Sequence, residues 1–128
     1  MQLPRMIGPL LAPLALAAAP QPAPIVTTGL HRWQRIADRQ VRVDKVVEDS
    51  RCPMNARCVW AGRAIVRVTL REGTRRRTVD VTLGEPIPFA GGKLELVSVT
   101  PEKMAGAQPK RPAPYRFSFE YRRGKTTA

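Results

Sequence analysis

The two cysteines of this chain, Cys52 and Cys58, are the residues whose type and spacing point most directly to chemistry. Two cysteines six positions apart can close a small disulfide ring, whereas thiolates can also bind a soft metal or stay free. A copper site would add the thioether of Met54 and the imidazole of His31. However, the C-x5-C spacing matches no strong metal motif, and His31 lies outside the segment. The spacing therefore favours a Cys52–Cys58 disulfide with no metal and no cofactor, and it leaves metal-bound and free thiols as alternatives.

Catalytic chemistry has few residues to carry it. His31 is the one histidine of the chain, so acid–base or triad chemistry would depend on it alone. Asp49 and Ser50 are adjacent, but they precede a Cys-Pro turn, where such side chains usually bond the local backbone. The sequence has no glycine-rich phosphate loop and no carboxylates paired at a useful spacing. We therefore expect no catalytic residues and no enzymatic activity.

Arginine is the second chemical feature, in a chain whose formal net charge is +12. Placed on a hairpin tip and on the polar face of the strand before it, six arginines would form one basic patch. Such a patch would attract anionic envelope polymers, lipid phosphates or nucleic acid, although a charged strand face is often only solvated. Most aromatic residues fall on the expected core face, so base stacking is not indicated and nucleic acid is not an expected partner. The six arginines are Arg63, Arg67, Arg71, Arg75, Arg76 and Arg77.

The elements that position these residues are expected to follow an export signal. Residues 1–17 contain a short charged opening, an apolar run and then small residues, which is the order of a secretory signal peptide cleaved after Ala17. A disordered Ala/Pro-rich N-terminus is the alternative. The apolar run is too short to span a bilayer, so no transmembrane segment is expected in the mature chain. The mature protein would be periplasmic or secreted, where oxidising conditions favour the disulfide.

The remaining chain is long enough for one domain. Residues 18–29 are rich in Ala, Pro and Thr and are expected to be a flexible lead-in. Residues 30–123 would form a single β domain, and residues 124–128 a frayed tail. The 13 prolines disfavour long helices.

From Gln40 onward, apolar residues recur with a period of two, which predicts short strands. The pattern changes face near Val97–Ser98, which predicts a β-bulge there or burial of both faces. The expected fold class is all-β: a small antiparallel β-sandwich or partly open barrel with one short-range disulfide loop. The inward positions are Val41, Val43, Ala64, Val66, Val68, Leu70, Val79, Val81, Leu83, Leu94, Leu96, Tyr115, Phe117, Phe119 and Tyr121.

One hairpin can be placed in register by argument. A four-residue loop over 72–75 sets Val68 opposite Val79 and gives the favourable pair of Arg67 with Asp80. A two-residue loop at 72–73 would instead oppose apolar to charged positions. We therefore expect the four-residue loop.

The segment Asp49-Ser50-Arg51-Cys52-Pro53, followed by Cys58-Val59-Trp60-Ala61-Gly62, resembles the shared pattern of a family of small exported bacterial proteins and lipoproteins. The resemblance implies export, a disulfide and a β fold, and it implies no reaction. This chain departs from the lipoprotein members because it lacks a lipidation cysteine. We expect Trp60 to pack over the end of the sheet and anchor the loop to the core. The expected structural residues of the motif are Asp49, Ser50, Arg51, Pro53, Trp60 and Gly62.

These observations predict a non-catalytic exported β domain that acts by binding or structural support in the cell envelope. Its partner would be a protein or an anionic envelope component. One alternative is a polyanion-binding module that uses the Arg-rich hairpin. Another is a protease-inhibitor-like protein that presents the Cys52–Cys58 loop with Arg57 or Met54 exposed, because a rigid ring lowers the ordering cost of binding.

Overall fold

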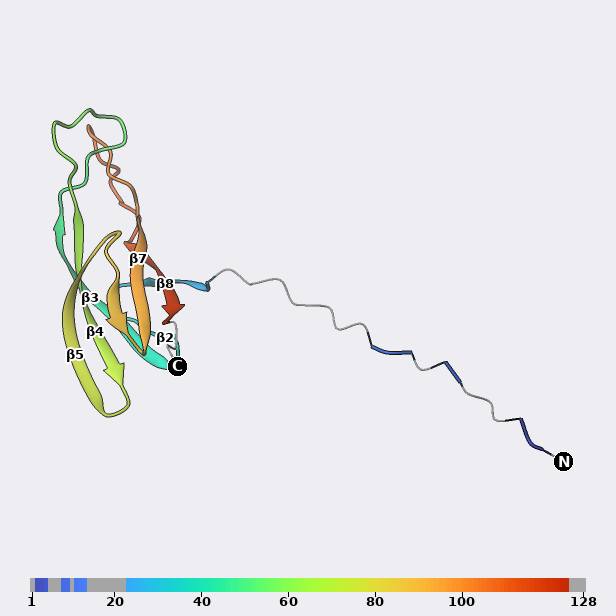
Figure 1. Cartoon of the computed structure of the whole chain (residues 1–128). Coiled ribbons are helices and arrows are strands. Elements are labelled where there is room, and N and C mark those ends of the chain that lie inside the picture. The colour runs from blue at the N-terminus through green and yellow to red at the C-terminus, as the bar shows by residue number, and fades with distance from the viewer. Residues whose placement is uncertain (1, 5–7, 10, 14–22, 125–128) are drawn as a thin grey trace.

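The computed structural model describes residues 2–4, 8–9, 11–13 and 23–124, and it shows an all-β protein (Figure 1). The described residues form two four-stranded antiparallel sheets and no helix. Among them there is accordingly no helix long and apolar enough to cross a membrane. Of the expected signal peptide at 1–17, residues 1, 5–7, 10 and 14–17 lie outside the described residues, as does the tail beyond Gly124. The first sheet has the order β1 (Ile25–Gly29), β8 (Arg116–Arg123), β7 (Gly92–Thr100) and β6 (Ile87–Phe89). The second has the order β2 (Trp33–Ile36), β3 (Arg39–Asp49), β4 (Ala64–Glu72) and β5 (Arg75–Thr82).

One apolar core joins the two sheets into a β-sandwich. The inward positions expected from the period-two pattern are all buried or packed against this core, because alternate side chains of a strand share one face. Phe117 and Phe119 of β8 are its largest fully buried side chains. The all-β fold class is therefore confirmed, together with the short-range disulfide loop.

The register of the β4–β5 hairpin is confirmed. Val68 pairs with Val79, and Arg67 pairs with Asp80. The ladder runs one pair further than expected, since Glu72 also pairs with Arg75. The turn therefore consists of residues 73–74, and Gly73 supplies the positive φ of 62° that this tight connection needs.

The expected bulge in β7 is also confirmed. The β7–β8 register shifts between Leu96 and Ser98, which brings Val99 back to the core side. β3 contains two further shifts, between Val43 and Lys45 and between Val46 and Glu48. They were not expected, because the run of valines there gives no clear alternation.

Strands β1, β2 and β6 were not predicted. The flexible lead-in expected at 18–29 is wrong for Ile25–Gly29, which forms β1 and pairs with β8. β2 was missed because its turn to β3 is Ala37–Asp38, with φ of 51° and 58°. Two positive φ values suit a tight hairpin, but Ala-Asp is not the glycine-containing signal that identifies one in a sequence.

The two ends of the sandwich differ in construction, as Figure 1 shows. At one end, the segments 50–63 and 101–115 lie side by side as long loops, and we call this the loop end. The Met54 amide donates to the Lys103 carbonyl at 2.8 Å, and Asn55 exchanges side-chain hydrogen bonds with the Ala105 backbone. At the opposite end, which we call the hairpin end, the tight β2–β3 and β4–β5 turns close the sheet.

Candidate functional site

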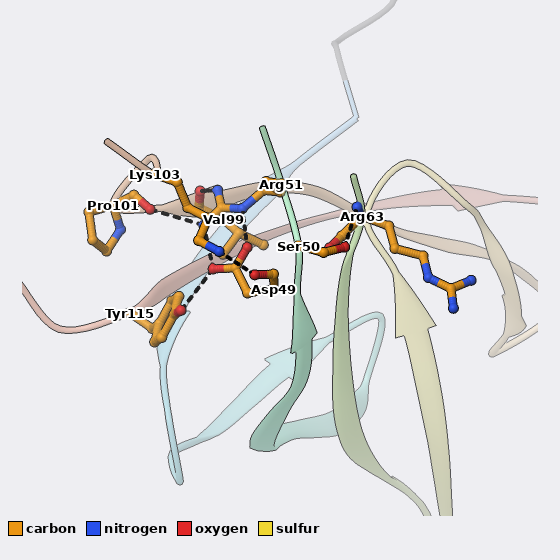
Figure 2. Close-up of polar contacts among 8 residues, drawn as sticks. All are labelled: Asp49, Ser50, Arg51, Arg63, Val99, Pro101, Lys103 and Tyr115. Carbon is orange, nitrogen blue, oxygen red and sulfur yellow. Dashed lines mark hydrogen bonds and ion pairs between the residues drawn. The ribbon is translucent and has the colours of Figure 1, made fainter. Parts of the chain in front are cut away.

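A partly buried ion pair between Asp49 and Arg51 forms the base of the loop end (Figure 2). Asp49 is the last residue of β3, and its carboxylate accepts two hydrogen bonds from Arg51, from Nε at 2.7 Å and from Nη2 at 2.9 Å. The Tyr115 hydroxyl donates to the same carboxylate at 2.8 Å. The side chains of Asp49 and Arg51 are only 9% and 14% exposed. Such a two-point contact fixes geometry as well as charge.

The same contacts control ionisation. The hydrogen bond from Arg51 is the largest influence on Asp49, and together with the Tyr115 hydroxyl it lowers the pKa of Asp49 to about 2, against the opposing effect of burial. Burial, followed by the hydrogen bond to Asp49, raises the pKa of Tyr115 above its ordinary value. Asp49 is therefore a fixed anion at neutral pH, and it is not arranged to exchange a proton.

Arg51 also reaches the end of β7 and the segment that follows it. It donates to the Val99 carbonyl at 2.7 Å and to the Pro101 carbonyl at 3.0 Å, while the Lys103 ammonium donates to the Asp49 carbonyl. Figure 2 shows these groups converging from two segments far apart in sequence. The Asp-Ser-Arg part of the motif thus ties the disulfide loop to the first sheet.

Ser50 and Gly62 close the neck of the disulfide loop. The Ser50 amide donates to the Arg63 carbonyl at 2.8 Å, and the Arg63 amide donates to the Ser50 hydroxyl at 3.1 Å. A Cβ atom on Gly62 would lie 1.6 Å from the Ser50 carbonyl oxygen. Glycine is required here for this close approach of two backbone segments.

The expected disulfide is present. Cys52 and Cys58 are bonded with their Cα atoms 5.9 Å apart, so neither sulfur is a free thiol or a thiolate ligand. Pro53 opens the turn inside the ring, and its carbonyl accepts a hydrogen bond from the Ala56 amide at 3.1 Å. Within the described residues, His31 lies exposed in the β1–β2 turn, and no three His, Cys, Asp or Glu side chains gather as a metal-binding group.

The packing expected for Trp60 is wrong. Its side chain is 70% exposed, and its neighbour Val59 is 93% exposed. The loop is anchored by the Asp49–Arg51 pair, the disulfide and the contacts at the neck, so it does not need an aromatic anchor. Trp60 is therefore available for contact with another molecule.

The six arginines do not share one face. Residues 67 and 71 of β4 and residue 76 of β5 point away from the core, whereas Arg75 and Arg77 share the opposite side of the sheet with Leu70. Arg77 donates to the Pro88 carbonyl at 3.1 Å. The prediction of a single patch of six arginines is therefore wrong. Consecutive side chains of a strand point to opposite faces, so Arg75, Arg76 and Arg77 cannot all lie on one side. Two of the six arginines form ion pairs: Arg63 with Glu48 at 2.6 Å and Arg67 with Asp80 at 2.9 Å.

A smaller basic cluster does form on the outer face near the hairpin end. Three guanidinium groups lie over the indole ring of Trp33, with their central carbons 4.6, 4.9 and 5.7 Å from its centre for Arg42, Arg71 and Arg76. The strand register adds Arg35, which shares a row across the sheet with Gln40, Arg71 and Arg76. We define Trp33, Arg35, Arg42, Arg71 and Arg76 as the basic face.

The charge of the basic face is only partly compensated. Arg42 pairs with Asp44 at 2.7 Å, and Arg71 donates to the neutral Gln40 at 3.1 Å. Among the described residues, no carboxylate lies within ion-pair distance of Arg35, Arg71 or Arg76. An anion approaching this face therefore meets three arginines that are not already paired with a carboxylate.

Sequence reasoning missed Trp33, Arg42, Lys103 and Tyr115 as members of these clusters. Trp33 and Arg42 were missed because β2 was not recognised, and the β2–β3 register places them opposite each other. Lys103 and Tyr115 lie about 50 or more positions from Asp49, at separations of 54 and 66 residues. No local pattern connects residues so far apart.

Comparison with known proteins adds no further assignment. No protein-family model, curated protein or solved structure matches the chain. The resemblance carried by the motif therefore remains a prediction.

Proposed function

We propose that this protein is a non-catalytic exported β domain that acts in the cell envelope by binding, and that it binds an anionic polymer through its basic face. The observation that carries the proposal is the row of uncompensated arginines beside Trp33. Clustered guanidinium groups bind phosphate, sulfate or carboxylate groups through charge and paired hydrogen bonds. The disulfide supports export, since such bonds persist in oxidising compartments.

The arrangement favours anionic groups over stacked bases. The guanidinium groups already lie over the Trp33 ring, so the indole serves to hold arginines in place. A sheet face with side chains at fixed spacing presents several positive charges to a repeating anionic chain at once. Long-range attraction by the overall charge of +12 would speed the encounter.

The protease-inhibitor alternative has less support. Residues 54–55 form a turn, and both are hydrogen-bonded to the segment 103–105. An inhibitor loop needs an extended segment that a protease can pair with, so we do not adopt this alternative.

Heparin-column retention with a salt titration tests the polyanion proposal. The informative variant replaces Arg71 and Arg76 with serine, and the matched control replaces Arg75 and Arg77, which are both in β5 and lie on the other side of the same sheet. Both variants lose two charges. The Arg71/Arg76 variant should elute at lower salt than the control variant. Its heparin binding should also depend less steeply on salt concentration, because fewer ions are released on binding. Equal weakening of the two variants would mean that only net charge matters, and would overturn the basic face as the binding surface.

A further inference from the structure

Exposed apolar side chains concentrate at the loop end. Within residues 23–124, six large hydrophobic side chains are exposed, and four of them belong to the two long loops. We define these four as the loop tip: Met54, Val59, Trp60 and Met104. Isolated exposed apolar residues are ordinary, but several gathered on neighbouring loops mark an interaction surface.

The loop tip is held rigidly enough to present these side chains without collapsing onto the core. The Cys52–Cys58 bond closes the ring, and Asn55 bonds the Ala105 backbone in both directions, at 2.9 and 2.7 Å. The Asp49–Arg51 pair fixes the base of the loop. A surface that is already ordered loses little conformational entropy on binding.

The two loops that carry the loop tip are rich in positive charge. The segment 50–63 contains no Asp or Glu, and the segment 101–115 contains only Glu102. Arg57, Lys110 and Arg111 are exposed, and none forms an ion pair with a described residue. Exposed tryptophan combined with free cations is the chemistry of a surface that meets the interface of an anionic membrane, where indole rings lie at the headgroup level.

The shape of the loop tip also suits a bilayer. Val59 is 93% exposed, so it protrudes from the loop and does not line a groove. A protruding apolar side chain gains burial on entering a fluid interface, which needs no complementary pocket. We propose that the loop tip docks onto an anionic lipid bilayer, with Val59 and Trp60 at headgroup depth and with Arg57, Lys110 and Arg111 against the lipid phosphates. This proposal does not depend on polyanion binding by the basic face, which lies toward the opposite end.

Vesicle co-sedimentation combined with tryptophan fluorescence tests the docking. The chain has two tryptophans, so Trp33→Phe leaves Trp60 as the only reporter. With vesicles of equal parts phosphatidylglycerol and phosphatidylcholine, Trp60 emission should shift to shorter wavelength, whereas pure phosphatidylcholine should cause a much smaller change. Val59→Ser with Trp60→Ala should weaken sedimentation at least about tenfold.

The matched control is Ile25→Ser with Val47→Ser, which removes two exposed apolar side chains from strands β1 and β3 and should leave binding unchanged. All variants carry the same N-terminus, so its contribution cancels. Three results would overturn the proposal: no binding of the unaltered chain, no shift of Trp60 emission, or full binding by the loop-tip variant. If binding instead disappears in Arg71→Ser with Arg76→Ser, the basic face is the membrane contact. Heparin retention is measured separately, so failure here leaves the polyanion proposal standing.

Discussion

Arg51 at the loop end and Arg67 on the outer face both pair with an aspartate, yet their surroundings differ. Arg51 is 14% exposed and makes four hydrogen bonds, two to Asp49 and two to backbone carbonyls at the end of β7 and just beyond it. Arg67 is 39% exposed and bonds only to Asp80, which is 43% exposed. The partly buried Asp49–Arg51 pair orders the chain around it, whereas the exposed Arg67–Asp80 pair mainly balances charge on a solvated surface.

Replacing each arginine by methionine should give the largest difference between the two regions. Arg51→Met leaves the partly buried Asp49 carboxylate without its partner, which should lower the free energy of unfolding by about 3 kcal/mol, the lower end of the range for breaking a buried pair. Arg67→Met should cause a much smaller loss, because Asp80 stays in contact with water. Urea unfolding at neutral pH measures both. Similar losses in the two variants would show that the loop end is no better ordered than the outer face.

The strands of the sandwich can be predicted from sequence more fully than the loop end, because strand patterns are local whereas the contacts of the loop end are not. Period-two alternation locates β4, β5 and β8 and places Phe117 and Phe119 in the core, because the pattern is local. It also gives the hairpin register, since apolar positions must oppose each other. By contrast, the hydrogen bond between Asp49 and Tyr115 joins residues 66 positions apart, and no periodicity reports it.

The two tryptophans show how the environment of a residue can be misjudged. Trp60 was expected to pack over the end of the sheet and anchor the loop, because it directly follows the disulfide ring. The structure instead anchors its loop through polar groups and leaves the indole exposed. Trp33 could not be assigned to the basic face, because its strand begins before the alternating pattern becomes clear and ends in an Ala-Asp turn.

The disulfide should contribute the next largest effect, and it should be confined to the loop end. Replacing Cys52 and Cys58 with serine removes a loop-closure constraint worth roughly 2.4 kcal/mol for a seven-residue ring. Heparin retention should not change, because the basic face lies toward the hairpin end. Denaturant unfolding and heparin chromatography of the double variant check both expectations. A loss of retention as large as the loss of stability would contradict the independence of the two regions.

Acid should weaken the Asp49–Arg51 pair. The pKa of Asp49 is lowered from 3.8 to about 2 in the folded chain, chiefly by Arg51. Its stabilising contribution is therefore complete above about pH 4 and disappears as the pH falls toward 2. The loss should be at most about 2 kcal/mol, since the carboxyl retains some contact with water. Urea unfolding between pH 5 and pH 2 measures this loss. In Arg51→Met the free energy of unfolding should depend less on pH over the same range. An unchanged pH dependence in that variant would exclude the Asp49–Arg51 pair as the source of the loss.

The smallest effect on stability is expected at the most exposed aromatic residue. Trp60→Ala should change the free energy of unfolding by no more than about 0.5 kcal/mol, because 70% of the side chain is already in water. Trp33→Ala should cost more, about 1 kcal/mol or above, because it removes the ring over which three guanidinium groups lie. Urea unfolding of the two variants, side by side, measures this difference.

A loss of about 3–5 kcal/mol in Trp60→Ala, the range for truncating a buried aromatic side chain, would show that the loop folds back onto the core in solution. The loop tip would then have no free indole for a membrane, and the basic face would be the better candidate for every contact the protein makes.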